Sequence, residues 1–298
     1  MSPQLVRTLI FVALGVIGVV YVAGWWRALA RTGGPQRPSW LENAIGFVTN
    51  FFDTLGIGSF APTTSLFKLK NVVRDEEIPG TMHVGHTPPV LVQAPIFIAL
   101  IQVGTTTLVS LIVAAVLGAW LGAGVVASWP RRRLQIGMGV ALVIAAVAFT
   151  LSNYGLFPSG GTATSLEGPR LAAASGAMFV YGALMTLGIG IYAPCMITIS
   201  LLGMNPGVAF PIMMGASAFL MPVAAFRFMK AERYDKSAAI GLTLGGIPAV
   251  FIAAFLVKSL PLTLLRWLVV IVVLYAAQAM LRSAARERAG AIPFADAA

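Results

Sequence analysis

The chain has 298 residues, of which 58% are hydrophobic and only 10% are charged. An ordinary soluble domain has roughly 25% charged residues, so this composition indicates a membrane protein with several spans, and no soluble domain is visible. The net charge of +10 would suggest nucleic acid binding in a soluble protein, but the basic residues sit in short clusters between apolar runs. Membrane topology explains them, and no nucleic-acid partner is expected. The single cysteine, Cys195, excludes an intrachain disulfide framework.

The first apolar run, residues 5–26, is long enough to cross a membrane as a helix. A cleaved signal peptide is the alternative, because Ala28-Leu29-Ala30 resembles a processing site. The run is longer than the core of a signal peptide, so we expect a retained helix. Residues 1–42 are therefore expected to form an N-terminal transmembrane helix and a basic loop.

One eight-residue stretch occurs twice, first as Leu55-Gly56-Ile57-Gly58-Ser59-Phe60-Ala61-Pro62 and again as Leu187-Gly188-Ile189-Gly190-Ile191-Tyr192-Ala193-Pro194. Glycine admits unusual backbone angles and proline lacks an amide donor, so each stretch should break a helix. Broken helices persist at membrane depth only where protein or a water-filled cavity surrounds them. Two breaks related by a repeat are typical of a secondary transporter. Two glycine-rich packing faces between helices are the alternative.

The apolar segments around these stretches predict two similar halves. We expect a broken element at 43–69 and helices at 81–103, 105–129 and 134–151 in the first half, then a broken element at 171–202 and helices at 208–229, 238–257 and 262–281 in the second. The expected fold class is an all-α polytopic membrane protein with two inverted repeats, each a broken re-entrant element plus three transmembrane helices. The repeats cover 43–151 and 171–283, with a linker at 152–170 and a cytoplasmic tail at 284–298.

The distribution of basic residues predicts the topology. If both broken elements are re-entrant hairpins and the N-terminus lies outside, 16 of the 20 basic residues are inside. The four outside are Arg7, Arg170, Lys258 and Arg266. Full crossings would divide the basic residues almost evenly, so the positive-inside rule favours hairpins that enter from opposite sides. It also predicts a cytoplasmic C-terminus in the cytoplasmic (inner) membrane.

Opposed half-helices present free N–H groups and partial positive charge at their amino ends, which suits a small anion. Hydroxyl groups follow both breaks and either add donors to this site or bond only to their own backbone. They belong to Thr63, Thr64, Ser65, Thr198 and Ser200. Cys195 either recognises a sulfur compound as a thiol of lowered pKa or serves as a packing residue.

Asp53 is the one acidic residue expected inside the membrane, where a charge is costly, so a functional role is the default hypothesis. It would relay a proton or partner a cation, or it would lie at the interface or cap a half-helix. His83 and His86 either titrate on an anion's path or form a solvated pair in a loop. Two histidines are too few for a metal site, so neither a metal nor a cofactor is expected.

These residues resemble the TauE/SafE family of sulfite exporters, also called the TSUP family of anion permeases. The resemblance rests on the duplicated Gly-x-Gly-x-x-x-Pro elements and covers about residues 43–283. It implies transport of small sulfur oxyanions or organosulfonates, such as sulfite, thiosulfate or sulfoacetate, commonly outward across the cytoplasmic membrane. The expected substrate-binding residues are Gly56, Gly58, Ser59, Pro62, Thr63, Thr64, Gly188, Gly190, Pro194, Cys195 and Thr198, with Asp53, His83 and His86 as coupling residues.

The expected function is therefore export of such an anion by alternating access at a central site, and not enzymatic catalysis. A divalent-metal permease is an alternative that the scarcity of intramembrane carboxylates disfavours. An intramembrane enzyme is another, but a rhomboid-like protease needs a Gly-x-Ser-Gly nucleophile that residues 56–60 do not supply. The expected partners are the anion and the lipid bilayer, and a homodimer is left open.

Overall fold

A computed structural model of the chain describes residues 3–126, 128–156, 160–188 and 190–256, with ten further positions between 267 and 285. The described residues form helices and turns without a β-strand, which confirms the all-α class. The helices are α1 (Pro3–Arg31), α2 (Trp40–Thr54), α3 (Phe60–Lys70), α4 (Ile78–Leu100), α5 (Thr105–Val126), α6 (Arg131–Asn153), α7 (Gly168–Met185), α8 (Tyr192–Leu201), the short η1 (Pro206–Val208), α9 (Ala209–Lys230) and α10 (Lys236–Leu256). The predicted helix at 262–281 and the tail at 284–298 lie largely outside the described residues.

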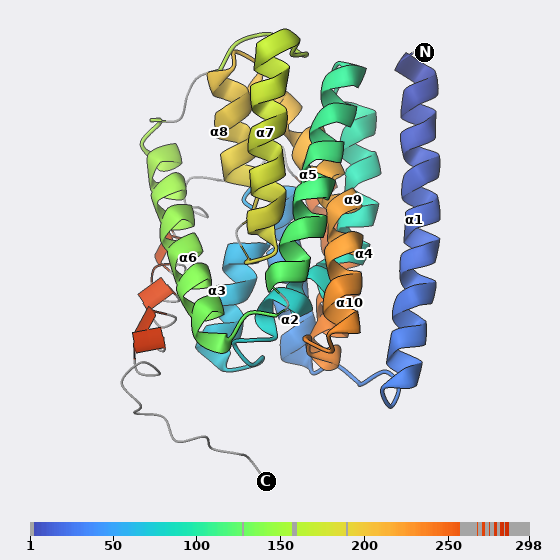
Figure 1. The fold of residues 1–298 in the computed structure, drawn as a ribbon, viewed down its shortest axis with the longest axis vertical. Helices are drawn as coiled ribbons and strands as arrows, with labels where there is room; N and C mark the ends of the chain where they lie inside the picture. The colour runs from blue at the N-terminus through green and yellow to red at the C-terminus, as the bar shows by residue number, and fades with distance from the viewer. Residues whose placement is uncertain are drawn as a thin grey trace.

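The two predicted breaks are both present. In the first half, helix α2 ends at Thr54 and α3 begins at Phe60. In the second half, α7 ends at Met185 and α8 begins at Tyr192. The α7–α8 pair occupies the upper part of the bundle in Figure 1, and α3 lies in its lower part. The prediction that each glycine-proline stretch interrupts a helix is confirmed.

Four helices in the described part of the chain are long and apolar enough to cross a membrane, namely α1, α5, α9 with its preceding turn, and α10. Helix α1 stands at the edge of the bundle (Figure 1) and exposes a row of large apolar side chains, including Val12, Val16 and Val19. Helices α5 and α6 also expose valine, leucine and isoleucine side chains. Such extended apolar surface is unfavourable in water and compatible with a membrane-embedded protein.

Helices α4 and α9 pack against each other in the middle of the bundle, and most of their residues are buried. Helix α2 packs along α10, and α5 packs along α7. Helix α5 also contacts α9, just as α10 also contacts α4. The two broken elements are therefore held from the side by one long helix each, with the α4–α9 pair between them.

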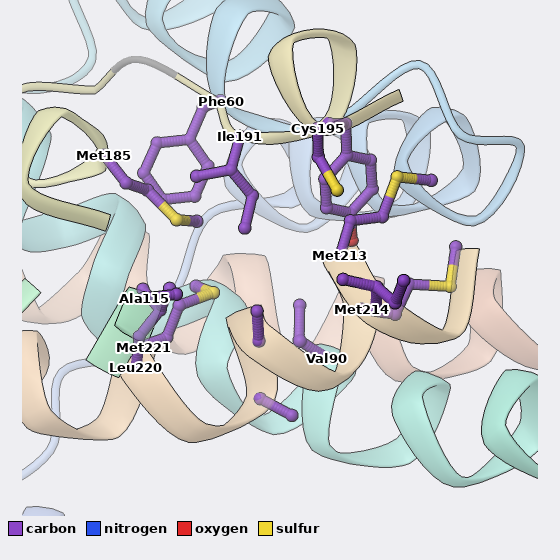
Figure 2. Close-up of a cluster of buried hydrophobic side chains, with 14 of the residues drawn as sticks. Phe60, Val90, Ala115, Met185, Ile191, Cys195, Met213, Met214, Leu220 and Met221 are labelled. Atoms are coloured by element: carbon purple, nitrogen blue, oxygen red, sulfur yellow. The ribbon is translucent and has the colours of Figure 1, made fainter. Parts of the chain in front are cut away.

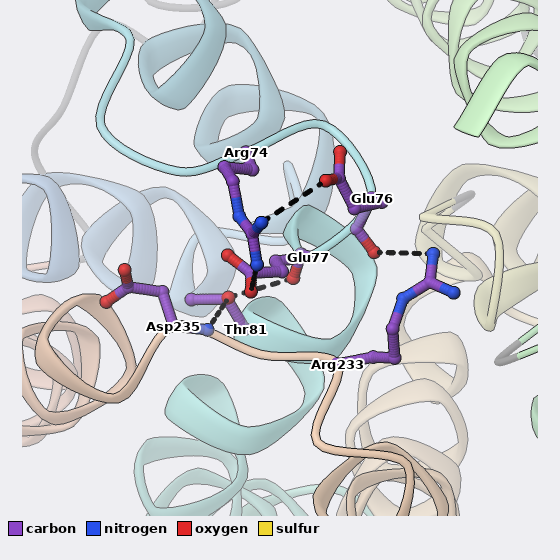
Figure 3. Close-up of polar contacts among 6 residues, drawn as sticks. All are labelled: Arg74, Glu76, Glu77, Thr81, Arg233 and Asp235. Carbon is purple, nitrogen blue, oxygen red and sulfur yellow. Dashed lines mark hydrogen bonds and ion pairs between the residues drawn. The ribbon is translucent and has the colours of Figure 1, made fainter. Parts of the chain in front are cut away.

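The lower end of the bundle in Figure 1 is closed by polar contacts between loops of the two halves, which Figure 3 shows in detail. The Asp235 backbone N–H donates to the Thr81 hydroxyl (2.9 Å), and Arg233 donates to the backbone carbonyl of Glu76 (3.5 Å). Arg74 lies 3.8 Å from the carboxylate of Glu76. The loop before α4 is thus joined to the loop between α9 and α10.

Glycines allow close approach at the two longest helix contacts. Gly118 and Gly122 of α5 face α7, and a Cβ atom added at Gly182 of α7 would lie 2.1 Å from the carbonyl oxygen of Ala115. Helix α10 approaches α2 through a second Gly-x-x-x-Gly pair, Gly241 and Gly245. Small residues at this spacing let helix backbones approach closely, as is known from membrane helices.

We predict opposite effects of two alanine substitutions on α7. Gly182→Ala forces apart α5 and α7, so the midpoint of thermal unfolding should fall, by a loss of about 1–3 kcal/mol for overpacking. Gly176→Ala meets no atom within 4 Å, so it should leave the midpoint unchanged or raise it, because alanine favours a helix. Both are measured by thermal unfolding in the same detergent, and equal midpoints would contradict the close contact.

Candidate functional site

The two breaks have the backbone geometry that their glycines permit. Gly56, Gly58 and Gly188 have φ angles of +82°, +89° and +90°, a region that side chains with a Cβ atom rarely enter. Pro62 and Pro194 each lie in the first turn of the following helix, where a missing amide proton costs no hydrogen bond. The glycines therefore end one half-helix, and the proline is accommodated at the start of the next.

The tips of the two broken elements lie against each other. A Cβ atom added at Gly58 would lie 3.8 Å from the ring of Tyr192, the first residue of α8. A Cβ atom added at Gly190 would lie 3.9 Å from the side chain of Phe60, the first residue of α3. Each break therefore packs against the amino end of the half-helix that follows the other break. We call this region the central site.

Asp53 links the two tips at the central site. One carboxylate oxygen accepts the backbone N–H of Ser59 (2.6 Å), and the other accepts the hydroxyl proton of Tyr192 (2.8 Å). The Asp53 side chain is buried. It lies at the start of α3, where the capping alternative places it. The bond to Tyr192 also joins the first half of the chain to the second.

Gln93 and Thr54 extend this network. The side-chain oxygen of Gln93 lies 3.4 Å from the Tyr192 hydroxyl, and its nitrogen lies 3.4 Å from the Thr54 hydroxyl. Both side chains are buried. The Tyr192 hydroxyl therefore has two acceptors within reach, the Asp53 carboxylate and the weaker Gln93 amide.

His86 is held between two polar partners on α2 and α3. Its Nδ1 lies 3.1 Å from the Asn50 side-chain oxygen, and its Nε2 lies 2.9 Å from the Thr63 hydroxyl. The Asn50 nitrogen donates to the carbonyl of Gly46 (2.7 Å), so the Asn50 oxygen faces the histidine as an acceptor. This pattern fits a neutral ring that carries its proton on Nδ1 and accepts the Thr63 proton at Nε2.

His83 is buried one turn earlier on α4, so the interpretation of the two histidines as a solvated loop pair is wrong. Its Nδ1 lies 2.8 Å from the Pro79 carbonyl oxygen, and its ring packs edge-on against Phe60 with centroids 5.1 Å apart. Its Nε2 has no hydrogen-bond partner within the described residues. His83 thus offers one free ring nitrogen beside the first residue of α3.

The hydroxyls and the thiol expected to bind substrate differ in their surroundings. Thr64 donates to the sulfur of Met82 (3.3 Å), and Ser65 bonds to the backbone of its own helix at Ala61, as the alternative interpretation expects. Thr198 bonds to Tyr181 (2.8 Å) on the neighbouring helix. The hydroxyls of Thr63, Ser65 and Thr198 therefore already have partners.

Cys195 and several methionines of α9 form the apolar side of the central site. Figure 2 shows Cys195 beside Met213, with Phe60 and Ile191 in the same cluster. Cys195 and Met213 are fully buried. The thiol lies in apolar packing, in agreement with the packing alternative for this residue.

Two helix amino ends face the central site. The first i→i−4 bonds of the two half-helices are made by the amides of Thr63 and Cys195, to Ser59 and Ile191. The amides that precede them at each end have no partner within their own helix. Aligned peptide dipoles place roughly half a positive charge at each such end. The central site therefore combines two partial positive charges with one carboxylate.

The structure brings some of the predicted site residues together, and the central site also contains residues that the sequence did not single out. Asp53, Gly58, Ser59, Thr63 and His86 do meet at the central site, whereas Thr198 lies a turn and a half along α8. Asn50, Thr54 and Gln93 were not anticipated, and Tyr192 was seen only as a motif position. Polar residues in otherwise apolar helices are costly in a membrane, so Asn50 and Gln93 carried a usable signal.

Comparisons with protein families, with curated proteins and with solved structures give no match to this chain. Within the described residues, no group of three or more His, Cys, Asp and Glu side chains is placed to hold one metal ion. The chemistry of the central site must therefore be argued from its own geometry.

Replacement of Tyr192 by phenylalanine tests the link between the tips. Tyr192→Phe removes the hydroxyl that donates to the buried Asp53 carboxylate, and the loss of a hydrogen bond to a charged group costs about 1.5–3 kcal/mol. We expect a lower thermal unfolding midpoint. Tyr181→Phe is the matched control, because Tyr181 is only partly buried and its hydroxyl bonds to the neutral Thr198 hydroxyl, not to a carboxylate. A fall of the same size in both variants would contradict a special role of the Asp53 contact.

Proposed function

We propose that this chain is a secondary transporter of the inner membrane that exports a small sulfur-containing anion, such as sulfite or an organosulfonate. The observation that carries the proposal is the meeting of two half-helix amino ends in the protein interior. Backbone N–H groups and dipoles at such ends favour anions. The sulfur chemistry rests on the resemblance of the duplicated Gly-x-Gly-x-x-x-Pro elements to TauE/SafE exporters.

We further propose that the two halves are inverted repeats. In this assignment α2, α3, α4 and α5 correspond to α7, α8, α9 and α10. The contact of α2 with α10 then corresponds to that of α7 with α5, and the contact of α4 with α10 to that of α9 with α5. Tips that meet from opposite ends of the bundle also support this assignment. Inverted repeats around a midplane site are typical of transporters that work by alternating access.

The orientation of the protein is part of the same proposal. The segments that carry most of the basic residues, at the ends of α1, α3 and α9 and at the start of α6, lie at the lower end of the bundle in Figure 1. The positive-inside rule assigns this end to the cytoplasm. The start of α1 lies at the opposite end, so the N-terminus is outside.

In this proposal, Asp53 couples the binding of the anion to the binding of a proton. Its carboxylate already accepts the Ser59 amide at the amino end of α3, the position that a substrate anion would take. Two negative charges in one buried site repel strongly. Protonation of Asp53 removes this repulsion and releases the amide, so each anion would be bound together with a proton. His86 is neutral in its present contacts and serves mainly to orient Thr63.

The two alternative functions would need other arrangements of the side chains at the central site. A divalent-metal permease would need Asp53, His83 and His86 to turn toward a shared ion, although His86 is now held by Asn50 and Thr63. An intramembrane enzyme would need a nucleophile with a base, and no hydrogen bond in the described part of the chain joins the Ser59 hydroxyl to a histidine. Neither alternative explains the two opposed amino ends.

Ligand-dependent thermal stabilisation tests the anion site. Sulfite or sulfoacetate should raise the unfolding midpoint in a saturable way, by about 2.7 kcal/mol when the ligand is at a hundred times its Kd. Gly58→Val should abolish the response, because valine is strained at a φ of +89° and its side chain enters the central site. Gly33→Val is the matched control: Gly33 has a φ of +93° in an open loop, so the strain is similar and the site is untouched. A response to nickel alone would contradict the anion proposal and favour the metal alternative.

The pH dependence of sulfoacetate binding tests the role of Asp53. Sulfoacetate stays fully ionised near neutral pH, so only the protein titrates. Binding should weaken as the pH rises in the wild type, because ionised Asp53 repels the anion. Asp53→Asn should bind at every pH with little change in affinity, whereas Asp235→Asn, in the loop before α10, should keep the wild-type profile. A pH-dependent Asp53→Asn variant would contradict coupling through Asp53.

A further inference from the structure

A cavity of about 500 Å³ lies between the end of α1 and the ends of α9 and α10. Three cationic side chains line it, those of Arg31, Lys230 and Lys236. Two glutamates, Glu77 and Glu232, also line it. We call this cavity the α1 pocket, and it is separate from the central site.

The charges of the α1 pocket are not balanced. Glu77 is paired with Arg74, which does not line the pocket, and Lys236 donates to the backbone carbonyl of Thr32. In the described part of the chain, neither Arg31 nor Lys230 has an ion pair. The pocket therefore presents three cations against the single carboxylate of Glu232, which is exposed.

The remaining walls of the α1 pocket are largely apolar. Ala28, Phe226 and Met229 line it together with the ring of Tyr234. On the same face of α1, one turn before Gly24, Val20 is exposed. The cations of the pocket thus lie where α1 and α9 end and α10 begins. Its apolar wall faces the middle of these helices.

We propose that the α1 pocket binds one anionic phospholipid, with its phosphate at Arg31 and Lys230 and its acyl chains along α1. Helix ends mark the level of lipid headgroups when a helix crosses a membrane, and the basic end is the cytoplasmic side in our assignment. Each Lys or Arg near an anionic membrane surface contributes about 1 kcal/mol to binding, or about fivefold in affinity. The lipid fills the space that separates the end of α1 from α9 and α10.

Native mass spectrometry of the full chain with phosphatidylglycerol tests this proposal. We expect one tightly bound lipid, with phosphatidylcholine bound more weakly. Arg31→Gln combined with Lys230→Gln should weaken phosphatidylglycerol binding by about 25-fold, as the product of two fivefold effects. The matched control is Lys70→Gln, an exposed cation at the end of α3 that does not line the pocket. An equal loss in the control would overturn the proposal, since it would show a general surface effect.

Filling the α1 pocket gives a second, steric test. Ala28→Phe should displace the lipid without a change of charge. Ala13→Phe makes the same change on the same helix but in an apolar cavity of about 390 Å³ between α1 and α5, so it should keep the tightly bound phosphatidylglycerol. Inorganic phosphate should not compete at millimolar concentration. Retention of the lipid in Ala28→Phe, or displacement by inorganic phosphate alone, would overturn the proposal.

Discussion

A helix that begins inside an apolar bundle leaves backbone N–H groups that water cannot reach, and the rest of this structure depends on how they are satisfied. Each unsatisfied group costs several kcal/mol in hydrocarbon. At the start of α3, the carboxylate of Asp53 accepts the Ser59 amide. That solution buries a charge, and the charge in turn requires the hydroxyl of Tyr192. The start of α3 therefore depends on a hydrogen bond from the first residue of α8.

This dependence ties the two halves of the chain together at three levels. At the centre, Asp53 and Tyr192 join the tips. Along the sides, α10 of the second half supports α2 of the first, and α5 of the first supports α7 of the second. At the lower end, Thr81 accepts the amide of Asp235. The main hydrophobic core is therefore shared between the two halves.

The local chemistry of the sequence predicted the breaks because glycine and proline act through the backbone, independently of distant residues. The local sequence around Gly56 and Gly188 was enough to predict a helix interruption at each position. The length and apolar character of α1, α5, α9 and α10 were equally visible, because spanning length is set by composition alone.

Contacts between distant segments could not be predicted in the same way. His83 and His86 follow a charged loop, so solvent was a reasonable expectation, yet three buried elements surround them. The partners of Asp53 depend on the position of Tyr192, which is far away in the chain. The Gly-x-x-x-Gly pair at Gly118 is readable in the sequence, but its partner helix is decided only by the packing.

The methionines around the breaks have a further consequence. Met82 and Met138 are buried beside Gly188, and Met213 is buried beside Gly56. Unbranched thioethers adapt their shape at low cost, so the centre can rearrange without leaving voids. The same sulfur atoms are open to oxidation, and a sulfoxide would place a strong dipole in this apolar seam. The methionines at the centre thus make it sensitive to any small oxidant that gains access to it.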